Sequence, residues 1–61
     1  MAKKILIIED EEILAGLYKL KLEVEGYNVV IASDGEAGLV MAESEQPDLI
    51  LLDLLMPKSS P

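Results

Sequence analysis

The chain of 61 residues contains no cysteine, histidine, tryptophan or phenylalanine, and its aromatic residues are Tyr18 and Tyr27. Without cysteine there is neither a disulfide framework nor thiolate chemistry, which fits a reducing, cytoplasmic location. A core must therefore come from leucine, isoleucine, valine, alanine and methionine. Because 51% of the residues are apolar, the composition indicates a globular chain, and at this length one domain is the most it can hold.

Positive charge is also scarce, because five basic residues stand against twelve acidic ones and the net charge is −7. This balance argues against nucleic acid or an anionic membrane as the direct partner, and it favours a cation or a basic protein surface. Long hydrophobic runs are missing too. The apolar run at residues 5–8 is far too short to span a bilayer, and residues 1–4 lack the apolar stretch of a signal peptide.

What the chain does have is a regular alternation of strand and helix signals. A β-branched run closed by acidic residues predicts a strand over about residues 4–9, covered on both faces. Gly26 is a natural left-handed cap, so the next segment, about residues 12–25, is predicted to be a helix that ends there. Its apolar stripe at helical spacing is Ile13, Leu17, Leu20 and Val24, flanked by Leu14.

The same alternation continues in the middle of the chain. The β-branched and aromatic residues at about 27–32 predict a second strand. Asp34 is a good N-cap for a shorter helix over about residues 35–44, which has Leu39 and Ala42 on one face beside Gly38. Glycine costs about 1 kcal/mol relative to alanine inside a helix, so Gly38 is expected to permit close packing against a strand.

A third strand is predicted over about residues 48–53, apolar on both faces until its final carboxylate. Strands that alternate with helices across short loops predict right-handed crossovers, a parallel sheet and helices on both of its faces. The fold class is therefore α/β.

Acidic residues end two of the three predicted strands. Glu9 and Asp10 close the first strand and Asp53 closes the third, and the carboxyl ends of parallel strands share the edge where ligands bind. Carboxylates that meet in one cleft repel one another unless their pKa values rise or a hard cation joins them, and magnesium suits such oxygen ligands. We expect Asp10 to bind the metal directly, Glu9 through a water, and Asp53 and the backbone carbonyl of Leu55 as further ligands.

A magnesium ion beside a carboxylate nucleophile is what phosphoryl transfer requires, which makes Asp53 a candidate for forming an aspartyl phosphate. The other interpretation of Asp53 is a carboxylate that merely ends a strand. Glu9 and Asp10 have a structural alternative as well, because acidic residues before a helix stabilise its N-terminus.

Three segments together resemble the receiver domains of bacterial and archaeal response regulators: ILIIEDE at residues 5–11, ASDGE at 32–36 and PDLILLDLLMP at 47–57. The last is the most specific, because an apolar strand that ends in Asp and continues x-x-Met-Pro is a hallmark of that family. The resemblance implies a flavodoxin-like half with strand order 2-1-3. It further implies a cytoplasmic phosphorelay with a histidine kinase as phosphodonor, magnesium as cofactor, Asp53 as phosphoacceptor and the acidic pair Glu9 and Asp10. A signalling module is expected, and not an enzyme.

A complete receiver has five strands, and the resemblance implies a Ser or Thr on the fourth and a Lys on the fifth that have no counterpart among these residues. We therefore expect a truncated receiver over residues 1–56 with a flexible tail at 57–61, impaired in phosphorylation and switching. The third strand would become an exposed edge with apolar side chains on both faces. A homodimer of strand order 2-1-3-3′-1′-2′ would cover it.

Other classes of protein remain as alternatives. An engineered or truncated half-domain would only self-associate into that homodimer. A phosphatase of the haloacid dehalogenase type would need a second Asp two residues after the first, where Leu55 stands. A nucleotide-binding chain would need a glycine-rich loop with Lys and Ser or Thr, and no such motif is present.

Overall fold

The computed structural model describes residues 2–53. Its elements are β1 (Lys4–Glu9), α1 (Glu12–Val24), β2 (Asn28–Ala32), α2 (Gly35–Glu45) and β3 (Leu49–Asp53). The five predicted elements occur in the predicted order, and their ends lie within one residue of the expected positions. The expected tail at 57–61 lies outside the described residues. Within residues 2–53, no helix is long and apolar enough to cross a membrane.

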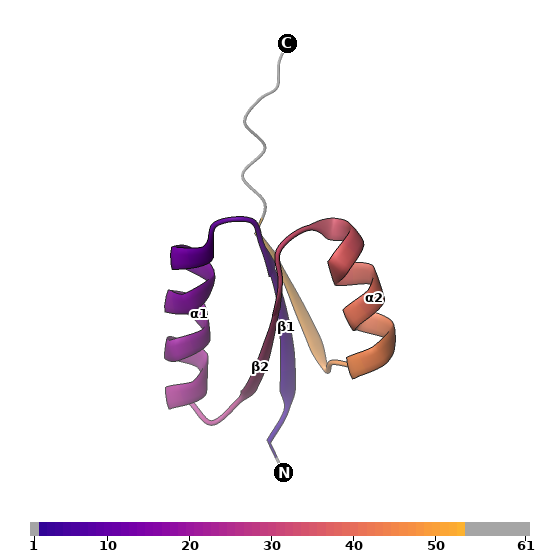
Figure 1. The fold of residues 1–61 in the computed structure, drawn as a ribbon. Coiled ribbons are helices and arrows are strands. Elements are labelled where there is room, and N and C mark those ends of the chain that lie inside the picture. Colours follow the sequence, from indigo (N-terminus) through magenta and orange to yellow (C-terminus); the bar gives the residue numbers. More distant parts are fainter. Residues whose placement is uncertain (1, 54–61) are drawn as a thin grey trace.

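The three strands form one parallel sheet in the order β2-β1-β3. Ile5 lies opposite Val29 on one side and Leu49 on the other, so β1 is the central strand. Figure 1 shows α1 on one face of the sheet and α2 on the other, with the carboxyl ends of the strands at the same end. The predicted fold class, strand order and two-sided helical cover are therefore confirmed.

The core is built on β1 because only a central strand has neighbours at both edges and helices over both faces. Its four apolar residues, 5–8, are all buried. Ile5 and Ile7 pack with Val29 on the side of α1, and Leu6 and Ile8 pack with Ala32 on the side of α2. The continuous apolar run thus fills two small cores at once, as expected for a strand covered on both faces.

The packed face of α1 differs from the predicted stripe. Ala15 is buried, and Tyr18 and Leu22 pack against the β1 core. The predicted stripe faces away from the sheet: Ile13 is 81% and Val24 77% exposed, and Leu17 and Leu20 are exposed as well. At 3.6 residues per turn the two sets lie on opposite sides of the helix. Because α1 is apolar on both sides, periodicity alone selected the wrong one.

The close approach predicted at Gly38 of α2 is confirmed. Gly38 is buried against β1, where a Cβ atom would lie 2.9 Å from Cγ1 of Ile8 and closer still to its Cδ1. Ala42 packs on the same core, whereas Leu39, expected beside it, is exposed. Asp34 is the predicted N-cap, since its side chain accepts a 2.8 Å hydrogen bond from the Ala37 N–H. Gln46, with a left-handed φ of 51°, ends the helix.

The edge strand β3 is the least covered element of the sheet. Its apolar residues 49–52 are all exposed, with Leu49 at 60% and Leu52 at 64%. Its start is tied to β1, because the Lys4 N–H donates a 2.7 Å hydrogen bond to Oδ2 of Asp48. No strand within residues 2–53 pairs with its outer edge. Among the described residues, β3 therefore presents an open apolar edge.

Candidate functional site

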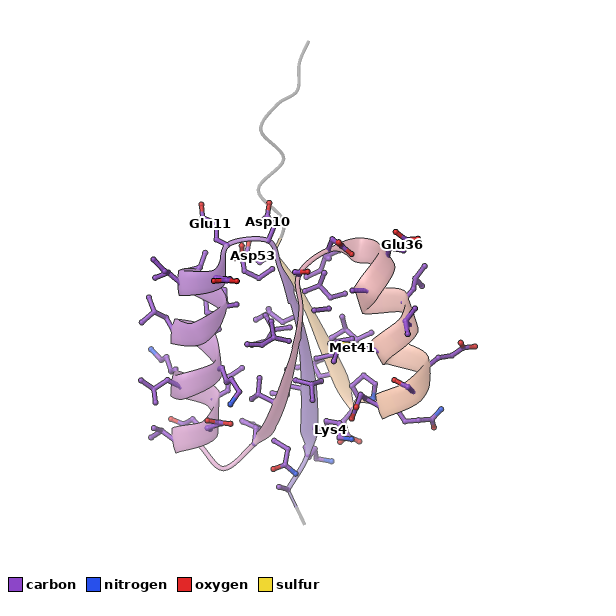
Figure 2. All side chains as sticks on the ribbon, in the orientation of Figure 1. Lys4, Asp10, Glu11, Glu36, Met41 and Asp53 are labelled. Atoms are coloured by element: carbon purple, nitrogen blue, oxygen red, sulfur yellow. The ribbon has the colours of Figure 1, made fainter. Side chains whose placement is uncertain are left out.

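The acidic residues singled out in the sequence come together at the carboxyl ends of β1 and β3. Glu9 lies directly opposite Asp53 in the parallel register, and Asp10 follows Glu9. Figure 2 shows Asp10, Glu11 and Asp53 gathered at this end of the sheet, whereas Lys4 lies at the other end. The fold thus places Lys4, the lysine of β1, at the opposite end of the sheet from Asp10 and Asp53.

Glu9 is the one buried charged residue of the described chain, with 2% of its surface exposed. Its Oε2 accepts a 2.9 Å hydrogen bond from the backbone N–H of Glu11, at the start of α1. Its Oε1 is buried and has no hydrogen-bond partner within the described part of the molecule. A buried carboxylate oxygen without a partner is costly, so this atom calls for a proton or a cation.

The pKa of Glu9 also indicates that its carboxylate calls for a proton or a cation. The hydrogen bond from the Glu11 N–H is the largest single influence and lowers the pKa of Glu9. It is outweighed by burial, by the adjacent Asp10 side chain and by the charges of Asp53 and Asp10, so the pKa is raised above the ordinary 4.5. Negative charge is therefore crowded around Glu9.

Asp53 is half-buried and has a partner that the sequence analysis did not identify. The Tyr18 hydroxyl donates a 2.6 Å hydrogen bond to Oδ2 of Asp53, linking α1 to the last residue of β3. This bond to the carboxylate is the main reason that the pKa of Tyr18 is raised, followed by burial and by the charges of Asp53 and Glu9. The sequence signal at Tyr18 is its hydroxyl, because a tyrosine that packs on a core usually finds a partner for it, but this signal does not identify the partner.

The described residues would supply only some of the ligands of a magnesium site. Among residues 2–53, no group of three histidine, cysteine or acidic side chains is arranged to hold a metal ion by itself. Magnesium, however, commonly takes only one or two carboxylates and keeps several waters. The unpartnered Oε1 of Glu9, beside Asp10 and opposite Asp53, suits that smaller donor set. The expected fourth ligand, the Leu55 carbonyl, lies outside the described residues.

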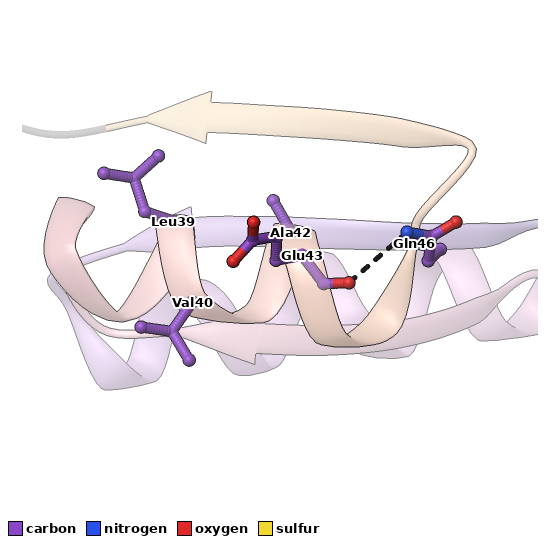
Figure 3. Close-up of a pocket in the computed structure, with 5 residues that line it drawn as sticks. All are labelled: Leu39, Val40, Ala42, Glu43 and Gln46. Atoms are coloured by element: carbon purple, nitrogen blue, oxygen red, sulfur yellow. Dashed lines mark hydrogen bonds between the residues drawn. The ribbon is translucent and has the colours of Figure 1, made fainter.

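Two pockets lie away from this acidic edge. Figure 3 shows one on α2, lined by Leu39, Val40, Ala42, Glu43 and Gln46. Within it, Gln46 Nε2 donates a 3.4 Å hydrogen bond to the Glu43 carbonyl. The other lies around the start of the sheet, between Lys3, Tyr27 and Asp48. Neither contains the carboxylates Glu9, Asp10 or Asp53.

A parallel α/β sheet of order 2-1-3 with an acidic edge at the ends of its first and third strands defines a narrow class of chain. Residues 5–60 match the response regulator receiver domain family, and the chain belongs to that family. Receiver domains of this family act in two-component systems with histidine kinases and generally bind magnesium.

Several curated proteins are similar to the chain. The alkaline phosphatase synthesis transcriptional regulatory protein PhoP of Bacillus subtilis is 53% identical over 58 residues, which cover 95% of this chain. The response regulator ArlR of Staphylococcus saprophyticus is 56% identical over 54 residues, or 88% of the chain. The transcriptional regulatory protein CpxR of Escherichia coli is 46% identical over 57 residues, or 93% of the chain. In each case the match spans 24% of the relative's length.

Proposed function

We propose that this chain is the phosphoacceptor part of a two-component phosphorelay, in which Asp53 receives the phosphoryl group from a histidine kinase. The observation that carries the proposal is the arrangement of Glu9, whose buried Oε1 has no partner among residues 2–53 and whose strand position faces Asp53. A buried carboxylate oxygen without a partner lowers the stability of the fold. Its presence opposite a second carboxylate therefore favours a site that binds a cation and a phosphoryl group.

In the proposed reaction, one carboxylate oxygen of Asp53 attacks the phosphorus of a phosphohistidine. The P–O bond forms while the P–N bond breaks, and its electron pair returns to the imidazole nitrogen of the kinase. Asp10, Glu9, Asp53 and the Leu55 carbonyl would hold magnesium, which when bound neutralises charge on the transferred phosphoryl oxygens. Asp53 is the nucleophile, and it is only half-buried, which favours access by a donor protein.

The product is a modified Asp53, so the chain acts as an acceptor that is consumed once per cycle and not as an enzyme. The proposed kinase donor implies a cytoplasmic site of action. These 61 residues have no counterpart of the fourth-strand Ser or Thr and fifth-strand Lys that the family resemblance implies. The chain alone is therefore expected to be phosphorylated more slowly than a complete receiver, and to switch poorly.

The test is phosphorylation with a small donor. The chain is incubated with magnesium and acetyl phosphate, and its intact mass is measured. One phosphoryl adduct is expected, and Asp53→Asn should abolish it. Glu36→Gln is the matched control, because Glu36 is an exposed carboxylate at the same end of the fold and should leave the adduct unchanged. Absence of the adduct under conditions that label a complete receiver would contradict the proposal.

A second candidate function is self-association through β3. It is supported by the exposure of the apolar residues 49–52 and by the free outer edge of β3 within the described sheet. Two copies pairing β3 with β3′ would cover these groups in a six-stranded sheet of order 2-1-3-3′-1′-2′. No membrane and no nucleic acid enter this proposal.

Sedimentation equilibrium tests the proposed homodimer. The unaltered chain is expected to be dimeric at micromolar concentration, and Leu52→Lys should make it monomeric by placing a charge on the pairing strand. Val40→Lys is the matched control, because Val40 is an equally exposed apolar residue on α2. A folded monomer of the unaltered chain would exclude this function.

A further inference from the structure

The hydrogen bond between Tyr18 and Asp53 occupies part of the proposed site. The hydroxyl lies 2.6 Å from Oδ2, which is the short distance typical of a hydroxyl donating to a charged carboxylate. It is the only hydrogen bond that the Asp53 side chain accepts from residues 2–53. Tyr18 is therefore the principal protein partner of Asp53 within the described structure.

The two oxygens of a carboxylate at such a site have different roles. When one oxygen bonds to phosphorus, the other remains as the ligand for a cation. A hydroxyl that donates to Oδ2 withdraws electron density from that ligand and occupies space beside it. It also satisfies part of the negative charge of Asp53 that a cation would otherwise neutralise.

We propose that the Tyr18 hydroxyl and a divalent cation compete for Oδ2 of Asp53, so that Tyr18 is a positioning residue that keeps this carboxylate turned toward α1 until the site is filled. The inference rests on the proposed function, because it concerns the same acceptor and the same metal. It assigns to α1 a role that the sequence motifs do not contain.

The ring and the hydroxyl of Tyr18 have separable roles. The ring packs against the buried cluster of Ile5, Ile7 and Val29 on β1 and β2. The hydroxyl reaches past this cluster to the end of β3. Binding of a cation to Oδ2 of Asp53 would release the Tyr18 hydroxyl and leave the ring in its packed position. Tyr18 thus provides a physical link by which α1 senses whether Asp53 is occupied.

The first measurement is the magnesium affinity of the full chain by isothermal titration calorimetry. Tyr18→Phe keeps the ring and removes only the competing donor, so it should bind magnesium roughly tenfold more tightly than the unaltered chain. Tyr27→Phe is the matched control, because Tyr27 is the other tyrosine and lies at the opposite end of the sheet. It should leave the affinity unchanged.

The second measurement requires no change at the site. In Tyr27→Phe the only fluorescent side chain is Tyr18, because the chain has two tyrosines and no tryptophan. A phenol hydrogen-bonded to a carboxylate emits weakly, since the carboxylate takes up its proton in the excited state. Tyr18 emission should therefore rise as magnesium saturates the site.

The outcomes separate this inference from the proposed function. If Tyr18→Phe binds magnesium no more tightly than the unaltered chain, or if Tyr18 emission stays constant while magnesium binds, the competition is wrong and the metal site stands. If neither chain binds magnesium, the proposed metal site fails, and the competition fails with it. Tighter binding by Tyr18→Phe together with rising Tyr18 emission would support both.

Discussion

The strands β1 and β3 have nearly the same composition and opposite environments. Each has four consecutive leucine or isoleucine residues and ends in a carboxylate. In β1 none of the four is more than 7% exposed, whereas in β3 the least exposed, Leu51, is at 36%. Composition therefore marks both as strands suited to burial on two faces, and the position in the sheet decides which one is buried.

Their terminal carboxylates differ in the same way. Glu9 is enclosed at the end of the central strand and has a buried oxygen without a partner in the described part of the chain. Asp53, directly opposite on the edge strand, is half-buried and has the Tyr18 hydroxyl as its partner. The central strand thus supplies an enclosed acid surrounded by negative charge, and the edge strand of the described sheet supplies a less enclosed acid that is hydrogen-bonded to α1.

The largest expected effect is on the apolar residues of the two strands. Leu6→Ala removes a fully buried side chain of β1 and should lower the free energy of unfolding by about 2–5 kcal/mol. Leu52→Ala on β3 should cost less than about 1 kcal/mol, because that side chain is mostly exposed. Urea unfolding followed by circular dichroism, at low protein concentration, measures both. Equal losses would mean that β3 is as well covered in solution as β1.

A smaller effect is expected from the helix that covers β1. Gly38→Ala places a methyl group into Ile8 and should destabilise the fold by about 1–3 kcal/mol, despite the higher helix propensity of alanine. Gly16→Ala is the matched change in α1, where a Cβ atom meets nothing within 4 Å. It should stabilise by up to about 1 kcal/mol. Thermal melting of the two variants should shift in opposite directions, and a rise for Gly38→Ala would contradict the close contact.

The subtlest effect concerns pH and the acid of the central strand. Because the fold raises the pKa of Glu9 above 4.5, the folded chain binds this proton more tightly than the unfolded chain. The resulting stabilisation is complete below about pH 4.5 and is lost as the pH rises through the raised pKa. Urea unfolding across this range should show a decline in stability that Glu9→Gln reduces. Glu36→Gln, an exposed control, should retain the decline, and identical profiles for all three chains would contradict the strain at Glu9.

The order and type of the elements were predictable because strong local signals separate them. The left-handed position at Gly26 and the cap at Asp34 each end or begin an element where the structure has it. The packed face of α1 was not predictable from periodicity, because the helix has apolar residues on both sides. Choosing between Ala15 with Leu22 and the opposite stripe requires knowing what lies next to the helix.

The acidic residues of the candidate site could also be placed from the sequence, whereas their surroundings could not. Glu9, Asp10 and Asp53 follow apolar strand runs, and parallel strands bring such positions to one edge whatever their separation in sequence. Their roles as metal ligands and acceptor remain predictions. Tyr18 could not be placed, because its contact with Asp53 depends on the face of α1 that packs. The burial of Glu9 depends in turn on β1 being central, which follows from the sheet order and not from the residue itself.

The central position of β1 has a consequence for how the chain is made. β1 is synthesised before both of its neighbours, which follow about 24 and 44 residues later, as the pairing of Ile5 with Val29 and Leu49 shows. Each pairing between neighbouring strands therefore closes a long loop, and a topology of this kind folds more slowly than one built from hairpins. Until Asp53 has been synthesised, the most apolar strand lacks one of its edges. The interval between the synthesis of β1 and of β3 is when this chain is most exposed to aggregation.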